Sequence, residues 1–202
     1  MTTFLNRTLL ALTLAASMSA YAADIPEAGT YKVDPMHSKV GFEIPHLVIS
    51  SVEGVFKTFS GTLKIGEKFE KSSLEASVDI GSIDTSVADR DTHLKSADFF
   101  DAAKYPKMTF KSTSITGTPG SFKMIGDLTI KDKTKKVTFD SNYKGSVKDA
   151  YGNLKAVFTA TTKISRKEFG LTWSKMVEAG PVVGDEVTLS LKIQAAKDVP
   201  KK

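Results

Sequence analysis

The sequence predicts an all-β protein, an antiparallel barrel or sandwich of about eight or nine short strands. Apolar and polar residues alternate with a period of two in one segment after another. Turn-forming residues separate these segments, for example at residues 117–120 and 151–153. Only residues 86–105 lack the alternation, and they predict one or two short helices over the sheet, ended by Pro106. No linker or repeat divides the chain after residue 23, so we expect a single domain.

The N-terminal half holds the shorter predicted strands. Runs at residues 31–33 and 39–44 predict the first two, and Pro45 ends the second. Residues 52–65 predict the third strand, whose apolar face changes phase near residues 57–58, where we expect a β-bulge. The later strands are predicted at residues 74–80, 108–110 (a weak run), 122–130, 137–143, 154–160 and 187–193.

Large and small apolar residues alternate on the inward faces of these strands. The chain has 12 Phe, and Gly or Ala often lies between the large residues. A closed barrel of about eight strands is either just filled by its side chains or holds one small ligand. The strand pattern therefore leaves both a filled core and a ligand cavity open.

Composition narrows the classes of function. The 202 residues are 41% hydrophobic and 25% charged, as in soluble globular proteins, and they carry a formal net charge of +5. The Lys residues are spread among Asp and Glu instead of forming one run, which argues against a nucleic-acid partner. The chain has no Cys, which excludes thiol redox chemistry, thiolate metal sites and Cys nucleophiles.

Residues 1–22 have the pattern of a secretory signal peptide. A basic residue precedes an apolar run at residues 8–16, and Ala20 and Ala22 supply the small side chains of a cleavage site. The run is too short to span a bilayer, which needs about 20 apolar residues, so an uncleaved anchor is the less favoured alternative. We expect cleavage after Ala22, which leaves residues 23–202 as a periplasmic domain.

The sequence offers no convincing catalytic group. A hydrolase triad could be imagined from Ser38, His37 and Asp34. Adjacent residues on a strand point to opposite faces, however, so His37 is badly placed to take a proton from Ser38. The three His residues lack the close spacing of a metal site. An enzyme acting on an isoprenoid would need an acidic metal cluster, and no Asp-rich motif is present. We expect no catalytic residue, no metal and no cofactor.

Ten sequence blocks occur in the order of one known family. They are DPMHSKVGFEIPHL at residues 34–47, SVEGVF at 51–56, FSG at 59–61, SIDT at 82–85, RDTHLKS at 90–96, DFFD at 98–101, YP at 105–106, GDLTI at 126–130, RKEFGL at 166–171 and VGDEV at 183–187. Together they resemble the YceI-like family over essentially all of the exported chain. The resemblance implies an eight-stranded, antiparallel, lipocalin-like barrel, with the short helices as a lid. It also implies a hydrophobic channel for a long apolar chain, typically a polyisoprenoid or its pyrophosphate. The sequence departs from the family pattern at residues 131–133, in a turn where a Gly is common.

The apolar strand faces and the family-like blocks supply candidate ligand-binding residues. They are Phe42, Ile44, His46, Leu47, Phe56, Phe59, Phe110, Phe158, Arg166, Phe169 and Trp173. Arg90 and His93 are further candidates, for the head group of the ligand or for the lid. A pyrophosphate head would need cationic donors, and Arg supplies planar, bidentate ones.

Structural roles compete with these ligand roles. Each apolar residue could be ordinary core. Arg90 could pair with Asp84, Asp89 or Asp91 and fix the lid, and Arg166 could pair with a nearby Glu.

The sequence therefore predicts a non-catalytic periplasmic protein that carries or sequesters an isoprenoid-like lipid, whose head could be a pyrophosphate or a quinone. Transient membrane contact fits that role, and an exposed apolar mouth would favour a homodimer. One alternative is a stress-related structural protein with a filled core. Another is an outer-membrane barrel, whose faces would be reversed. The single Trp and the lack of a terminal aromatic residue count against the membrane barrel.

Overall fold

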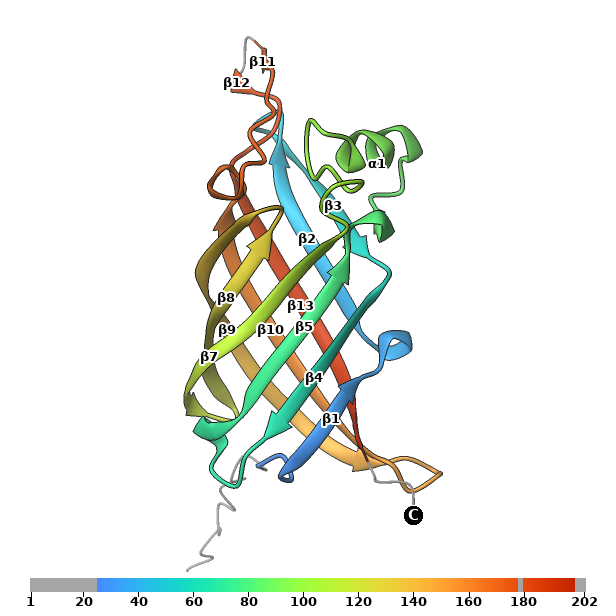
Figure 1. Ribbon diagram of the computed structural model, residues 1–202, viewed down its shortest axis with the longest axis vertical. Helices are drawn as coiled ribbons and strands as arrows, with labels where there is room; N and C mark the ends of the chain where they lie inside the picture. Colours follow the sequence, from blue (N-terminus) through green and yellow to red (C-terminus); the bar gives the residue numbers. More distant parts are fainter. Residues whose placement is uncertain (1–24, 178–179, 199–202) are drawn as a thin grey trace, which may run out of the picture.

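The computed structural model describes residues 25–177 and 180–198, which form a closed antiparallel barrel with one α-helix at its upper end (Figure 1). The predicted signal peptide, residues 1–22, lies outside the described residues. The strands are β1 (Gly29–Val33), β2 (Lys39–His46), β3 (Ser50–Phe56), β4 (Phe59–Ile65), β5 (Ser73–Asp79), β6 (Ile83–Asp84), β7 (Lys107–Thr118), β8 (Ser121–Ile130), β9 (Lys133–Lys148), β10 (Leu154–Ser165), β11 (Met176–Val177), β12 (Gly180–Pro181) and β13 (Glu186–Lys197). The helices are α1 (Ala88–Lys95) and the 3₁₀ helices η1 (Pro35–His37), η2 (Phe69–Lys71), η3 (Ile80–Ser82) and η4 (Lys167–Phe169).

The barrel closes because β1 pairs with both β4 and β13. Strands β1 and β2 pair with the two ends of β13, so η1 only interrupts what is one strand of the barrel. Strands β3 and β4 are likewise the two halves of a second barrel strand. Strands β5 and β6, which η3 separates, are the two halves of a third. The result is the antiparallel barrel of eight strands that the sequence and its family resemblance predicted.

The bulge expected at residues 57–58 is instead a break between two strands. Strand β3 pairs with β2 and β6, whereas β4 pairs with β1 and β5. The backbone N–H groups of Lys57 and Thr58 donate to Ser82, in the neighbouring interruption, at 3.1 and 3.0 Å. Because two residues separate Phe56 from Phe59 at this break, both rings are buried inside the barrel.

Strand β7 is much longer than the short run at residues 108–110 that predicted it. Its register against β8 shifts between Ser112 and Ser114. A shift of this kind moves side chains to the other face of the sheet, so it breaks the alternation that marks a strand in the sequence.

The barrel wall is apolar inside and charged outside. Its outer face carries cross-strand ion pairs, such as Lys123 Nζ with Asp140 Oδ1 at 2.6 Å and Lys163 Nζ with Glu186 Oε1 at 2.7 Å. A membrane-spanning barrel needs the opposite arrangement, with apolar side chains facing the lipid. The observed faces therefore contradict the outer-membrane alternative.

The predicted helical stretch lies over the upper end of the barrel (Figure 1). It contains the single helix α1, and turns make up most of the rest of residues 86–105. Phe100, which follows α1, stands edge-on to Phe56 of the barrel wall, with ring centroids 6.1 Å apart.

Within residues 25–177 and 180–198, no helix is long and apolar enough to cross a bilayer.

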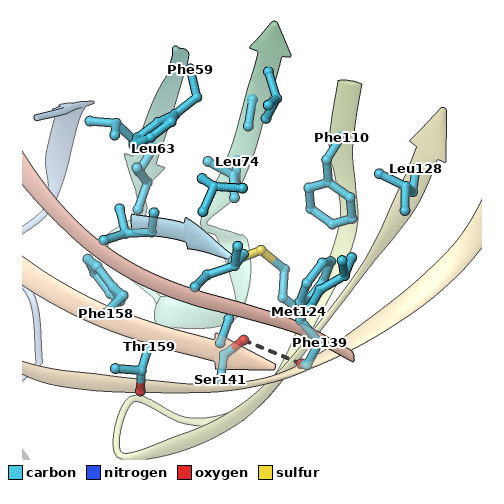
Figure 2. A pocket seen from close by; sticks show the side chains of 18 of the residues that line it. Phe59, Leu63, Leu74, Phe110, Met124, Leu128, Phe139, Ser141, Phe158 and Thr159 are labelled. Carbon is cyan, nitrogen blue, oxygen red and sulfur yellow. Dashed lines mark hydrogen bonds between the residues drawn. The ribbon is translucent and has the colours of Figure 1, made fainter. Parts of the chain in front are cut away.

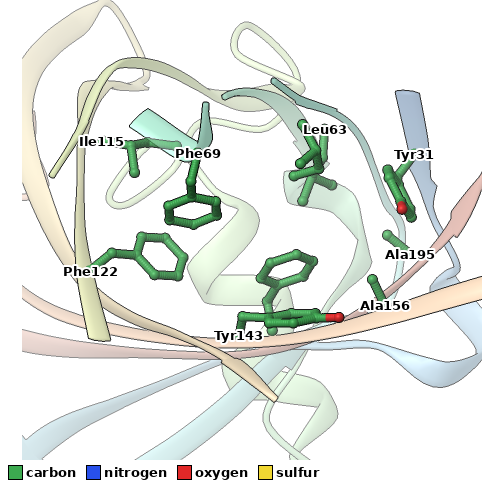
Figure 3. Packing of buried hydrophobic residues seen from close by; sticks show 10 residues of the cluster. Tyr31, Leu63, Phe69, Ile115, Phe122, Tyr143, Ala156 and Ala195 are labelled. Atoms are coloured by element: carbon green, nitrogen blue, oxygen red, sulfur yellow. The ribbon is translucent and has the colours of Figure 1, made fainter. Parts of the chain in front are cut away.

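An aromatic cluster closes the opposite end of the barrel (Figure 3). It includes Tyr31, Phe69, Phe122, Tyr143 and Phe158, all of them buried. Phe69, carried by η2, meets Phe122 edge to face with centroids 5.0 Å apart, and Tyr143 meets Phe158 at 5.3 Å. These rings therefore pack the lower end of the barrel, and Phe69, Phe122 and Phe158 also line the cavity next to them.

Candidate functional site

Two apolar cavities follow one another inside the barrel above this cluster. The lower cavity has a volume of about 150 Å³, and the upper cavity, next to α1, has a volume of about 210 Å³. Phe56, Met108 and Leu189 line both cavities, so only shared side chains separate them. The two cavities therefore adjoin one another at these three residues. The sequence left open a barrel interior filled throughout by side chains. That description fits only the lower end of the barrel.

The lower cavity is lined by inward-facing side chains of strands all round the barrel (Figure 2). Phe59, Phe110 and Phe158 supply aromatic wall, and Met124 supplies a flexible thioether that adapts to irregular shapes. Ser141 is a buried polar residue in this lining, and its hydroxyl donates to Phe139 O of its own strand at 3.3 Å. The lining therefore suits an apolar chain.

Gly126 makes room for the ring of Phe110 against the wall of the lower cavity. A Cβ at position 126 would lie 2.5 Å from Phe110 Cζ and 2.5 Å from Lys111 O. A glycine inside a strand weakens the strand, because it packs no side chain and loses more conformational freedom on folding. At this position it lets the ring lie close to the sheet, which keeps space open in the cavity.

The upper cavity combines an apolar wall with basic side chains. These are His46, Arg90, His93 and Arg166, and the described residues that line the cavity include no carboxylate. Positive charge without a facing carboxylate favours an anionic or uncharged ligand over a cation.

Arg90 is held by Thr85. Its Nε donates to Thr85 Oγ1 and its Nη2 to Thr85 O, each at 2.8 Å, and the Thr85 hydroxyl donates to Asp91 Oδ1 at 2.6 Å. The expected direct ion pair of Arg90 with a neighbouring Asp is therefore wrong for the part of the chain that the structure describes. The carboxylate of Asp91 accepts the hydrogen bond of the buried Thr85, and Asp84 forms an ion pair with Lys57.

Arg166 is buried and bound to backbone carbonyls. Its Nε donates to Gly184 O at 2.7 Å, its Nη2 to Val183 O at 3.4 Å and its Nη1 to Leu171 O. Burial lowers the pKa of Arg166, while the nearby Asp185 acts in the opposite direction. The expected pairing with Glu168 is wrong, because Glu168 is exposed on η4 and no described carboxylate forms an ion pair with Arg166. Arg166 ties the segment after η4 to the segment before β13.

His93 and Trp173 form an aromatic side of the upper cavity. The His93 ring is perpendicular to the rings of Phe99 and Trp173, with centroids 5.0 and 5.1 Å apart. Its Nε2 lies 3.0 Å from Asp98 Oδ2, and this contact restrains the ring. The α1 segment therefore contributes both a basic and an aromatic group to the cavity.

The structure places all but two of the predicted ligand and lid residues on the cavities. Those on the lower cavity are Phe56, Phe59, Phe110 and Phe158, and those on the upper cavity are Phe42, Ile44, His46, Phe56, Arg90, His93, Arg166 and Trp173. Leu47 lies outside both, because it belongs to the turn after β2 and is exposed. Phe169 also lies outside both, because η4 packs it into the core beside Leu171.

Sequence reasoning missed Met108 and Leu189, which join the two cavities. Both lie on predicted strands, and the alternation with period two is the signal that could have found them. Aromatic content, which the chosen residues share, does not reveal where two cavities adjoin.

Of the groups considered for hydrolase chemistry, His37 contacts Asp34, whereas the Ser38 hydroxyl is engaged elsewhere. His37 Nδ1 lies 2.9 Å from Asp34 Oδ2, on the exposed side of η1. Ser38 instead exchanges two hydrogen bonds with the backbone of Gln194, at 3.0 and 3.2 Å. The described residues hold no group of three or more His, Cys, Asp or Glu side chains that could bind a metal ion.

Comparison with known proteins assigns the family. The YceI-like domain model matches residues 31–195. Protein YceI of Escherichia coli O157:H7 is 36% identical over 196 residues, which cover 96% of this chain and 99% of that protein. The crystal structure of BcnA from Burkholderia cenocepacia superposes with a TM-score of 0.71 at 26% identity, covering 80% of this chain and 98% of that one. A polyisoprenoid binding domain from Saccharophagus degradans, implicated in plant cell wall breakdown, shares the fold with a TM-score of 0.62 at 11% identity, covering 85% of this chain and all of that one (100%). The chain therefore belongs to the YceI-like family.

Proposed function

We propose that the protein holds one isoprenoid-like lipid chain in its barrel, as a non-catalytic carrier or sequestering protein of the periplasm. One observation carries the proposal: two apolar cavities lie in line inside the barrel and meet at Phe56, Met108 and Leu189. A long chain could occupy both if these three side chains move slightly apart. Met108 is the most adaptable of them, because its thioether side chain is unbranched and has three rotatable bonds.

The free energy for binding such a chain would come from burial of its hydrocarbon. Each CH₂ group removed from water contributes about 0.8 kcal/mol, so a few isoprene units suffice for tight binding. The chain would enter beside α1, because the aromatic cluster around Phe69 and Phe122 fills the other end. Its polar head would then remain in the upper cavity.

The upper cavity suits a head group that accepts hydrogen bonds, such as a pyrophosphate or a quinone. Arg90 uses two of its donor nitrogens on Thr85, and its Nη1 makes no hydrogen bond within the described residues. A guanidinium group has five N–H donors, so Arg90 can still reach a ligand. Arg166 has all three nitrogens engaged with backbone carbonyls, which makes it the weaker head-group candidate.

Two further arguments support the proposal. The fold is shared with a domain whose name states polyisoprenoid binding. The signal-peptide pattern of residues 1–22 predicts export, and a periplasmic lipid needs a protein that shields its chain from water.

The test is to purify the exported protein from its native periplasm and to compare its native and denaturing mass spectra, followed by organic extraction. We expect one apolar adduct per chain, with fragments spaced by isoprene units. Phe42→Asp, which puts a carboxylate into the upper cavity, should lose the adduct. Lys39→Asp, on the exposed face of the same strand, should keep it. A protein without an adduct that also fails to take up added polyprenyl lipids would overturn the proposal.

A further inference from the structure

The turn between β2 and β3 and the β11–β12 segment project beyond the upper end of the barrel (Figure 1). Together they carry five exposed apolar residues. Leu47, Val48 and Ile49 form the turn between β2 and β3, and Met176 and Val177 form β11. Ile49 is 91% exposed, Met176 74% and Val48 64%. We call these five residues the apolar tip.

The two loops are joined into one unit. Leu47 N donates to Val182 O at 3.0 Å, and Gly184 N donates to Pro45 O at 2.9 Å. A Cβ at Gly180 would lie 3.3 Å from Val48 Cγ2, so the turn after β2 touches the β11–β12 hairpin. The apolar side chains of both loops are therefore presented together.

The turn after β2 is built against its local conformational preference. Leu47 has φ of 51° and Val48 has φ of 66°. This left-handed region favours Gly and Asn in tight turns, and a β-branched residue such as Val is an outlier there. Neither turn geometry nor burial explains these apolar residues. Departures of this kind from local preference concentrate at functional sites.

The apolar tip is continuous with the upper cavity. His46, Val182 and Val183 line that cavity. His46 precedes Leu47 in the chain, Val182 O accepts the hydrogen bond of Leu47 N, and Val183 pairs with His46 in a β-bridge. A surface that receives the tip would therefore lie beside the cavity in which the proposed function places the lipid head.

We propose that the apolar tip inserts into the interface of a phospholipid bilayer while the protein takes up or releases its lipid. This inference rests on the proposed function. A few aliphatic side chains on loop ends suit insertion into the boundary between head groups and acyl chains. A second copy of the chain is a poorer partner, because a stable dimer buries about 800 Å² on each subunit and the tip offers only five side chains on a projecting surface.

The test measures flotation of the exported protein with vesicles of phosphatidylethanolamine and phosphatidylglycerol. Val48→Ser combined with Ile49→Ser should lower the vesicle partition coefficient by about tenfold or more, because two aliphatic side chains lose their burial. The matched control combines Val147→Ser with Tyr151→Ser, which removes exposed apolar side chains near the β9–β10 turn. This control should float like the wild type.

A second variant guards against a folding defect. Leu47→Asn combined with Val48→Gly supplies the residues that this turn geometry favours, so it should be at least as stable as the wild type and still float less. Its equilibrium lipid occupancy, measured by native mass spectrometry, should be unchanged. Its transfer of a fluorescent polyprenyl lipid between vesicles should be slower.

The outcomes separate the two proposals. A wild-type protein that contains lipid but does not float would overturn membrane docking and leave the proposed function standing. Equal loss of flotation in the tip and control variants would also overturn docking. So would a tip variant that floats like the wild type and differs from it only in sedimenting as a monomer instead of a dimer. A protein that floats but never takes up lipid would overturn the proposed function and, with it, the role of the tip in lipid exchange.

Discussion

The ring of Phe42 lies across Gly54, its direct partner on the neighbouring strand. A Cβ on Gly54 would collide with this ring and would stand 2.9 Å from Thr85 Cγ2. Phe42 lines the upper cavity and meets Phe56 with ring centroids 5.7 Å apart. The missing side chain at position 54 therefore determines how closely Phe42 follows the wall and how much of the cavity stays open.

Gly54→Ala should narrow the upper cavity by displacing Phe42. We expect weaker lipid binding, measured by the fluorescence of the single Trp, Trp173, during titration with lipid. Overpacking should also lower the free energy of unfolding by about 1–3 kcal/mol. Gly41→Ala is the control on the same strand pair, because its Cβ would meet no atom closer than 3.4 Å. Unchanged lipid affinity in Gly54→Ala would contradict this account of the cavity.

Met108→Phe should separate ligands by chain length. Met108 lies where the two cavities meet, so a rigid ring there should block passage from the upper cavity to the lower one. Long polyprenyl chains should lose affinity, whereas short chains that fit the upper cavity should bind as before. Competition titrations with prenyl chains of increasing length measure this. Equal loss for every length would point to a general packing defect instead.

Arg166→Ala should act mainly on stability. It would leave the carbonyl oxygens of the buried Leu171 and the half-buried Gly184 without the guanidinium donor, and the loss at a buried oxygen costs about 1–3 kcal/mol. Urea unfolding should show this loss, and Arg166→Lys should recover only part of it, because an ammonium cannot reproduce the fork of the guanidinium. If Arg166→Ala instead kept full stability and selectively lost anionic lipids, Arg166 would be a head-group ligand.

The sequence identified most strands and most of the inward-facing aromatic residues correctly. Within one strand, alternation with period two fixes which side chains share a face, so Phe42, Phe110 and Phe158 could be assigned to the interior before any pairing was known. The same local signal predicted a change of phase between Phe56 and Phe59.

The pairing of strands and the polar contacts could not be predicted in the same way. Three barrel strands are interrupted at a common corner, and this depends on pairing between residues far apart in the chain, such as Lys57 and Ser82. Arg90 was expected beside an Asp, yet the intervening Thr85 accepts its hydrogen bonds. Local sequence shows which charged residues are near one another in the chain. It does not show which buried oxygen lies closest to a given donor such as the Arg90 guanidinium.

Tyr31 should make stability depend on alkaline pH. Burial raises the pKa of Tyr31 to about 12 from an ordinary value of 10.0, and the nearby Glu27 acts in the same direction. The phenol is fully buried and donates to Glu27 O at 2.8 Å. In the unfolded chain it ionises near pH 10, whereas the folded protein keeps the proton to about pH 12.

The sign of the effect follows from proton counting. Above about pH 10 the unfolded state binds fewer protons than the folded state, so the free energy of unfolding falls as pH rises, by up to about 1.4 kcal/mol per pH unit. The contribution of Tyr31 is complete below pH 10 and is lost progressively towards pH 12. Urea unfolding from about pH 9 to pH 11 should therefore show the stability advantage of the wild type over Tyr31→Phe shrinking with pH. Tyr151→Phe, at a position that is 91% exposed, should show no such trend. An advantage that stays constant across this range would mean that Tyr31 ionises equally in both states.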